Sequence, residues 1–429
     1  MKKTITGTLL FFLLLLPCLA EVTPAKSIYF SGSFYLDWYG ARYQQTDSFD
    51  QLSARIRLDL FNRPGSGWTL KLDGRNQMNL NRNTDNRVIL YETSLTYDKS
   101  GSPLYFSAGH MNLYDTGGIG QLLGGVIGYK PSKFLLLGGY AGLESNVYIK
   151  YMESDYWRFG LFGLYQGKLG KRLSFSFNQI RYSGVSEKKY LYFSGMIPIK
   201  KYLVLYGNAE YQLGPEVYSQ DRLSRLFFNL RFDPSSLFDV VMHYSSGKGL
   251  DFHRFALEKS QDPSLNDRNI ERFYYSRQYG IRTNLKPSKT LRFSFARMEM
   301  EQKDREIKNH TWIFSGAAVD IFKTGFSSYG SYRLNRGEIS ESDSYDITLN
   351  KDFGRISWSA AFTNTYNYLR FDGKSNVPQL IHKDDYKTLS TFLFIVFSRQ
   401  LAASFEYEYY FQENAGQHLF FLRLIYRKY

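Results

Sequence analysis

The sequence predicts an all-β protein, a transmembrane antiparallel β-barrel of about 22 strands. The first observation is a side-chain period of two, clearest in Leu401–Phe411, which reads LAASFEYEYYF. Its odd-numbered positions are mostly large and apolar, while Glu406 and Glu408 fall on the opposite face. The second observation is an aromatic content of 18%. A barrel in a lipid bilayer needs both features, since one face meets lipid and the other meets water.

Residues 1–20 have the pattern of a cleaved secretory signal peptide. Lys2 and Lys3 precede the apolar run Leu9–Leu16, and Cys18-Leu19-Ala20 provides a small-residue cleavage site. Lipidation at Cys18 is a weaker alternative, because Pro17 stands where a small residue is expected. We expect residues 21–429 to form a single outer-membrane barrel domain. Because Cys18 is the only cysteine, the mature chain is expected to have no disulfide, thiolate metal site or thioether-linked haem.

Alternating segments continue along the rest of the chain and are separated alternately by short and longer gaps. Alternation begins by Ile28, so we expect no N-terminal plug domain. Asn146–Glu153 is an ambiguous stretch that would raise the strand count to 24 if it formed a strand pair. The expected strands lie near 27–43, 49–62, 67–80, 87–98, 103–112, 121–131, 133–142, 156–167, 170–183, 187–198, 200–213, 221–233, 236–246, 270–286, 288–301, 308–322, 324–337, 340–352, 354–370, 384–398, 400–411 and 417–429.

Two further patterns refine these strands. Every proline after the signal peptide lies between alternating segments, including the two copies of Lys-Pro-Ser-Lys at 130–133 and 286–289, which are typical of tight turns. The alternation changes phase at Phe177–Ile180, Phe295–Met298 and Phe314–Val319, where we expect β-bulges.

The period of two assigns many charged residues to the lumen. In Leu52–Leu60, for example, the even-numbered residues are apolar and are expected to face lipid. Such a lumen could conduct ions and small polar solutes, with basic side chains favouring anions. Alternatively, the charges only pair across strands and stabilise a wet interior. The lumen-lining candidates are Arg55, Arg57, Asp59, Lys71, Asp73, Arg75, Glu92, Glu210, Arg225, Arg231, Arg282, Arg292, Arg333, Glu406, Glu408 and Arg423.

Two connecting segments stand out. Gly117, Gly118 and Gly120 belong to the densest glycine cluster and are candidates for a loop that folds into the lumen, because glycine permits tight backbone turns. An ordinary outer loop is the alternative. The loop around 247–271 is rich in charge; it is either a plain solvated loop or a site for divalent cations, lipopolysaccharide or a partner.

Composition excludes other classes of function. The net charge of +14 favours anionic lipid headgroups or a basic channel over nucleic acid, which an exported protein rarely meets. The six histidines show no metal-ligand spacing and no nucleophile pattern, so we expect neither an enzyme nor a cofactor. No stretch after the signal is apolar enough for a membrane-spanning helix.

With its signal peptide, alternating strands, short turns and the aromatic C-terminal strand His418–Tyr429, the chain resembles the Gram-negative porin-like outer-membrane barrels. The resemblance implies a channel in the cell outer membrane for passive passage of ions or small hydrophilic solutes. It also implies contact with outer-membrane lipid and lipopolysaccharide, and insertion by the barrel-assembly machinery. The alternative is a structural sheath around a periplasmic or surface partner such as a multihaem cytochrome. The chain itself has no Cys-x-x-Cys-His motif.

Overall fold

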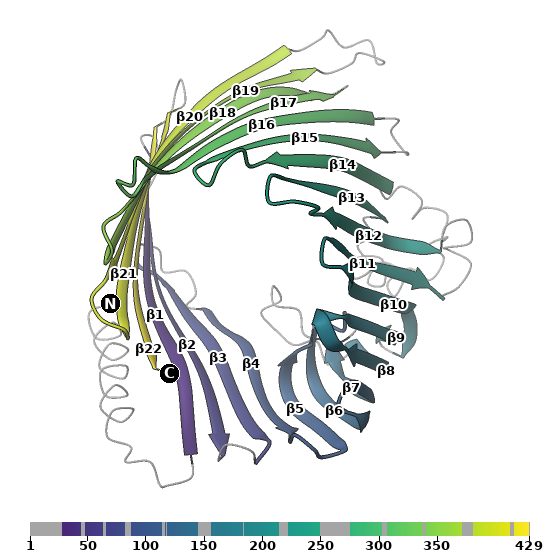
Figure 1. Cartoon of the computed structure of the whole chain (residues 1–429). Helices are drawn as coiled ribbons and strands as arrows, with labels where there is room; N and C mark the ends of the chain where they lie inside the picture. Colours follow the sequence, from purple (N-terminus) through teal and green to yellow (C-terminus); the bar gives the residue numbers. More distant parts are fainter. Residues whose placement is uncertain are drawn as a thin grey trace.

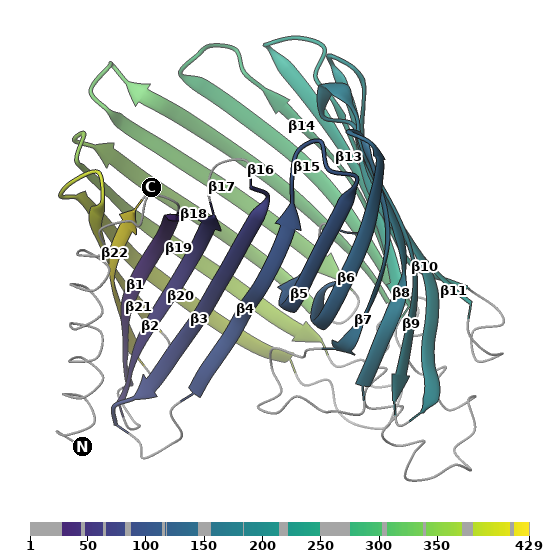
Figure 2. The ribbon, with the colours of Figure 1, turned by 90° about the horizontal axis from the view of Figure 1, so that it is seen from below.

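The computed structural model shows a closed β-barrel in which 22 antiparallel strands follow one another around the ring. It describes residues 28–43, 48–62, 66–81, 87–113, 116, 118–144, 156–182, 184–213, 222–248, 275–302, 307–337, 340–370, 381–411 and 416–428. Strand β1 pairs with β2 on one side and with β22 on the other, which closes the sheet. Figures 1 and 2 show this ring and the oblique course of its strands. The predicted fold class and strand number are confirmed.

Each predicted segment overlaps one strand of the structure. The strands are β1 (Ile28–Tyr43), β2 (Phe49–Asn62), β3 (Trp68–Asn79), β4 (Arg87–Asp98), β5 (Leu104–Asn112), β6 (Gln121–Ser132), β7 (Leu135–Glu144), β8 (Tyr156–Gln166), β9 (Arg172–Tyr182), β10 (Val185–Lys200), β11 (Leu203–Gln212), β12 (Leu223–Phe232), β13 (Phe238–Lys248), β14 (Tyr275–Leu285), β15 (Leu291–Gln302), β16 (Ile307–Ile321), β17 (Phe326–Gly337), β18 (Ser340–Asp352), β19 (Ile356–Arg370), β20 (Ile381–Val396), β21 (Leu401–Phe411) and β22 (Gln417–Lys428). The 3₁₀ turn Lys168–Gly170 connects β8 to β9.

All connections at one end of the barrel are short, and the long connections all lie at the other end, together with a few short ones such as that between β9 and β10. The ends of β1 and β22 that lie near the chain termini meet at the short-turn end, where Gly32 is opposite Lys428. Bacterial barrels place short turns and termini on the periplasmic side. The stretch Asn146–Glu153 and most of the loop around 247–271 lie outside the described residues, as does the predicted signal peptide.

Two prolines depart from the prediction that every proline lies between strands. Pro131 is within β6 and Pro198 is within β10. The pairing register shifts at both places, between Tyr129 and Ser132 and between Pro198 and Lys200. Because proline has no N–H to donate, it is tolerated in a strand only where the ladder is already interrupted, as it is here.

The three predicted bulges have different outcomes. A register shift between Ala318 and Ile321 overlaps the one expected at Phe314–Val319. At Phe177–Ile180 the irregularity instead lies on the partner strand, between Ser186 and Lys188. At Phe295–Met298 the prediction is wrong, since β15 pairs regularly with both neighbours. The phase of the pattern changes because the outward side chains of β15 go from apolar at Phe295 to charged at Arg297 and Glu299.

Candidate functional site: the inner face of the barrel

The two faces of the sheet differ in chemistry. Between β2 and β3, Leu58 lies opposite Leu72 on the outer face, and the next pair, Arg57 and Asp73, lies on the inner face. Outer-face side chains are exposed even when they are large and apolar, as for Ile127 at 65% and Leu161 at 63%. An apolar exterior around a charged interior, in a sheet without free edges, is the arrangement of a barrel that spans a membrane. The barrel therefore associates with membrane lipid.

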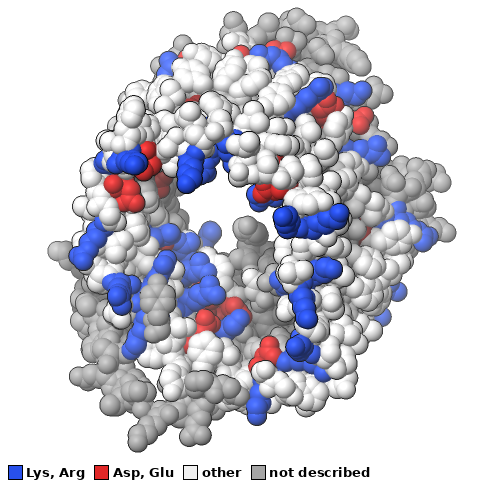
Figure 3. Space-filling model, viewed as in Figure 1, with Lys and Arg blue, Asp and Glu red and all other residues white. Residues whose placement is uncertain are grey.

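The registers place all of the predicted lumen-lining residues on the inner face, in three groups. Arg423, Arg55, Arg57, Asp59, Lys71, Asp73, Arg75 and Glu92 lie on β22 and β2–β4; Glu210, Arg225, Arg231, Arg282, Arg292 and Arg333 lie on β11–β17; Glu406 and Glu408 lie on β21. Glu408 accepts a hydrogen bond of 2.9 Å from the hydroxyl of Tyr410. Figure 3 shows basic groups around the central opening.

The first inner wall, where β22, β1, β2 and β3 meet, contains carboxylates that each hold arginines. Asp37 accepts hydrogen bonds from Arg423 Nε at 2.7 Å and from Arg75 Nη2 at 2.9 Å. Asp73 binds Arg55 through two hydrogen bonds of 2.8 and 2.7 Å. The Asp37 side chain is only 5% exposed, so its charge is compensated by these two arginines. We call this region the paired wall.

Sequence reasoning missed Asp37, although it lies between Tyr35 and Tyr39 on the same face of an alternating strand. Its position between two arginines depends on β22 lying next to β1, because Arg423 is 386 residues away along the chain. The closing contact therefore has no local sequence signal.

The second inner wall, on β12–β15, is richer in cations. A recess of about 470 Å³ is lined there by Arg231, Arg282, Lys286 and Arg292 together with a single carboxylate, Asp239. Asp239 accepts hydrogen bonds from Lys286 Nζ at 2.5 Å and from Asn284 Nδ2 at 2.6 Å. In Figure 1, β12–β15 face β1–β3 across the barrel. We call this region the cationic wall.

A buried polar network, also missed by sequence reasoning, lies between the two walls. The Arg158 side chain is 6% exposed, bonds to the hydroxyl of Tyr190, and lies 3.6 Å from the Glu144 carboxylate. Next to it, Lys188 Nζ is 2.8 Å from Glu210. Glu210 also accepts a hydrogen bond of 2.7 Å from Ser224 Oγ. The opposite charges of this network pair with one another, although Arg158 Nε and Glu144 Oε2 have no hydrogen-bond partner among the described residues, and the pairing points to a role in holding β7–β12 together.

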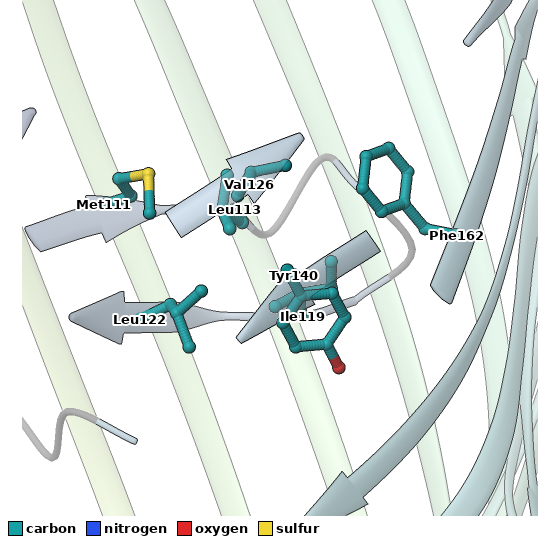
Figure 4. Close-up of a cluster of buried hydrophobic side chains, with 7 residues drawn as sticks. All are labelled: Met111, Leu113, Ile119, Leu122, Val126, Tyr140 and Phe162. Atoms are coloured by element: carbon teal, nitrogen blue, oxygen red, sulfur yellow. The ribbon is translucent and has the colours of Figure 1, made fainter. Parts of the chain in front are cut away.

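The segment between β5 and β6 packs against the inner side of β6–β8 in its described part. Leu113 and Ile119 are buried in a cluster with five other side chains, which Figure 4 shows: Met111, Leu122, Val126, Tyr140 and Phe162. The amide of Leu113 donates to the carbonyl of Gly120 at 2.7 Å, so the segment turns tightly back.

Glycines allow tight turns in this segment and close approach of the strands that it packs against. Gly118 has φ +65°, and a Cβ there would be 2.7 Å from the Tyr192 ring on β10. On the inner face below it, Gly124, Gly142 and Gly160 would each place a Cβ less than about 2.5 Å from a backbone oxygen of a neighbouring strand. Gly120 also has positive φ, at +81°, while Gly117 lies outside the described residues.

No group of three or more histidine, cysteine, aspartate or glutamate side chains in the described part of the chain could hold a metal ion. Within the same residues, no helix is long and apolar enough to cross a membrane.

Comparison with known proteins found similarity only at the level of solved structures. No known protein family matches the chain, and no curated protein matches it either. OprD of Pseudomonas aeruginosa is 11% identical, with a TM-score of 0.45 over 93% of this chain and 95% of that chain. OpdQ of the same organism is 9% identical, with a TM-score of 0.46 over 93% and 98%. OccAB4 of Acinetobacter baumannii is 10% identical, with a TM-score of 0.44 over 94% and 98%. We therefore infer function from this chain's own residues.

Proposed function

We propose that this protein is a porin-like channel of the cell outer membrane, which passes ions and small hydrophilic solutes without a catalytic step and favours anions. The observation that carries the proposal is the cationic wall, where four basic side chains and one carboxylate line a recess. Lys286 pairs with Asp239, and Arg231 pairs with Asp233 outside the recess, so Arg282 and Arg292 are the cations in excess among the described residues. Since charged side chains that line a water-filled pore act on ions at close range, an excess of cations favours anions.

The paired wall and the cationic wall face each other around an opening that is visible among the described residues in Figure 3. Fixed cations on the inner wall raise the local concentration of anions most at low ionic strength, where the screening length is about 10 Å at 0.1 M against about 3 Å at 1 M. We expect solutes with a carboxylate or phosphate group to pass more readily than neutral or cationic solutes of equal size.

The test is single-channel recording of the purified barrel in a planar bilayer across a salt gradient. We expect steady conductance and a reversal potential that shows anion preference, stronger at 0.1 M than at 1 M salt. A barrel that sheathes a partner protein would instead be blocked, or would leak without selectivity, until that partner is added. Cation preference at both salt concentrations would contradict the proposal.

The proposed channel also implies a cleaved signal peptide, a single barrel domain, insertion by the barrel-assembly machinery and contact with lipopolysaccharide. Residues 1–20 are removed as a signal peptide, and residues 21–429 form one barrel domain. The barrel-assembly machinery inserts it, and lipopolysaccharide surrounds its outer half. N-terminal sequencing of the protein from purified outer membranes tests the cleavage site before Glu21; an intact N-terminus would contradict it.

A further inference from the structure

The outer face of β14–β18 contains an apolar groove of about 620 Å³. Its floor is a pair of glycines, Gly316 on β16 and Gly330 on β17, which lie directly opposite each other in the ladder. Phe293, Phe295, Phe314 and Tyr332 form its walls, and the rings of Phe295 and Phe314 are 5.1 Å apart. Two adjacent glycines on a lipid-facing surface leave a hollow that is wide and apolar enough for a hydrocarbon chain.

A cluster of charged and aromatic side chains continues this groove toward the long-loop end. Arg297 Nη2 lies 2.5 Å from Glu299 Oε1, and His310 Nδ1 lies 3.6 Å from the same oxygen. Arg336 binds Asp343 on the next strand. These residues lie on the same outer face as the groove, because Phe295 pairs with Phe314 and Glu299 pairs with His310, while His310 in turn pairs with Arg336.

Arg297 is the deepest charge of this cluster. It lies as many residues above Leu291, at the short-turn end of β15, as Phe159 lies above Tyr165 on β8, where β8 presents Phe159 and Trp157 to lipid. Glu299 lies two residues further out, at a level where Arg181 on β9 and Lys387 on β20 also face outward. Because a charge on the lipid-facing surface is unfavourable except near the interface, polar headgroups at the level of Arg297 would stabilise it.

A second groove on the opposite part of the wall provides an internal comparison. It has a volume of about 610 Å³ and also has an opposed glycine pair, Gly195 and Gly207. Further along the same strands its outer face continues with Leu191 and Tyr211, which pair with each other. Beyond them, the described charges of this face are the cations Lys189 on β10 and Arg181 on β9, in place of the arginine–carboxylate pairs above the first groove. The two grooves therefore match in size and floor and differ in what lies above them.

We propose that the β14–β18 groove and the cluster above it form a binding site for one outer-leaflet lipid with a phosphorylated sugar headgroup. An acyl chain lies along Gly316 and Gly330, and the phosphate lies between Arg297 and Arg336. Each guanidinium has five N–H donors in a fixed fork that matches phosphate, so contact with a carboxylate leaves donors for a second oxyanion. Glu299 and Asp343 accept hydrogen bonds from the sugar hydroxyls.

The experiment measures lipid binding to the purified full-length barrel in detergent by native mass spectrometry. The probes are lipid A with both phosphates and the same lipid A after enzymatic dephosphorylation. We expect the phosphorylated form to bind at least tenfold more tightly. The headgroup variant is R297Q combined with R336Q, and the groove variant is G316L. A side chain at position 316 has room, because a Cβ at Gly316 meets nothing closer than Phe293 at 3.6 Å.

Each variant has a matched control on the same outer face. R181Q removes an arginine at the long-loop end of β9, away from the groove, where Arg181 lies 5.5 Å from the centre of the Phe159 ring. A209L fills the second groove, which Ala209 lines. The headgroup variant should lose the preference for the phosphorylated form, and G316L should weaken both forms, while R181Q and A209L should leave binding within twofold of the original.

Equal binding of the two lipid A forms to the unaltered protein would overturn the proposal, and so would equal loss in the controls. A difference in gel mobility between unheated and heated samples of each variant shows that the variant is folded. Channel conductance of the headgroup variant should be unchanged, because its residues lie outside the lumen, so failure of this proposal is distinguishable from failure of the proposed channel.

Discussion

The two inner walls both contain arginines and aspartates, but in one wall these charges pair and in the other the arginines are in excess. On the paired wall, Asp37 and Asp73 hold three arginines, and the contact between Asp37 and Arg423 spans the closing seam of the barrel. On the cationic wall, four basic side chains share a recess with Asp239; Lys286 pairs with Asp239 and Arg231 with Asp233, which leaves Arg282 and Arg292 in excess in the described part of the wall. A guanidinium whose charge is matched within hydrogen-bond distance contributes little field beyond it, whereas an excess of cations acts on passing ions. The number of arginines on a wall is therefore a poor guide to selectivity; the local balance with carboxylates is the better guide.

The largest effect is expected from removing the seam carboxylate in D37N. Arg75 and Arg423 would lose a common charged partner inside the barrel, which typically costs about 1–3 kcal/mol of unfolding free energy. Urea titration of the barrel in lipid vesicles, followed by tryptophan fluorescence, measures this loss. D59N is the control on the same face and should change stability by less than about 0.5 kcal/mol. Equal losses in the two variants would remove the special role of the seam.

The second prediction concerns the cationic wall. The triple variant R231Q/R282Q/R292Q should lower the anion-to-cation permeability ratio at least about fivefold at low salt, because one charge contact in water is worth roughly 1 kcal/mol. The reversal potential in a salt gradient measures this change. An unchanged reversal potential would show that this wall does not set selectivity.

A smaller effect of opposite sign is expected for D239N. This change removes the single carboxylate of the cationic recess, so the anion-to-cation permeability ratio should rise, by about twofold or less. The side-chain amide can still accept from Lys286, which contacts Asp239 at 2.5 Å in the original protein. A fall in the ratio would contradict the assignment of this recess to the conducting path.

The smallest effect on selectivity is expected for R55Q on the paired wall. Arg55 and Asp73 compensate each other, and the Asp73 side chain is only 11% exposed, so the loss of two hydrogen bonds should lower the free energy of unfolding by about 1–3 kcal/mol. The anion preference should change less than it does in the triple variant of the cationic wall. A change in reversal potential as large as that of the triple variant would erase the distinction between the walls.

Much of the architecture was predictable from local pattern. The period of two in segments such as Leu401–Phe411 predicted the strands, and it also predicted which side of Leu52–Leu60 faces lipid. It worked because lipid and water impose opposite requirements on successive residues. It failed at Phe295–Met298, where the outward face becomes charged without any bulge. The alternation of polar and apolar residues changes phase both at a β-bulge and where the outer surface passes from hydrocarbon to polar surroundings, so the sequence pattern alone cannot distinguish the two.

The sequence alone determined the class of fold, a strand count of about 22 and the side of each strand that carries charge, because these follow from the chemistry of neighbouring residues. Only the tertiary structure decided which charges neutralise one another. Asp37 binds Arg423 because the first and last strands become neighbours on closure, and Leu113 and Ile119 are buried against side chains of β5–β8 that the fold brings together. The balance of charge around the lumen, and hence its selectivity, depends on contacts between residues far apart in the chain.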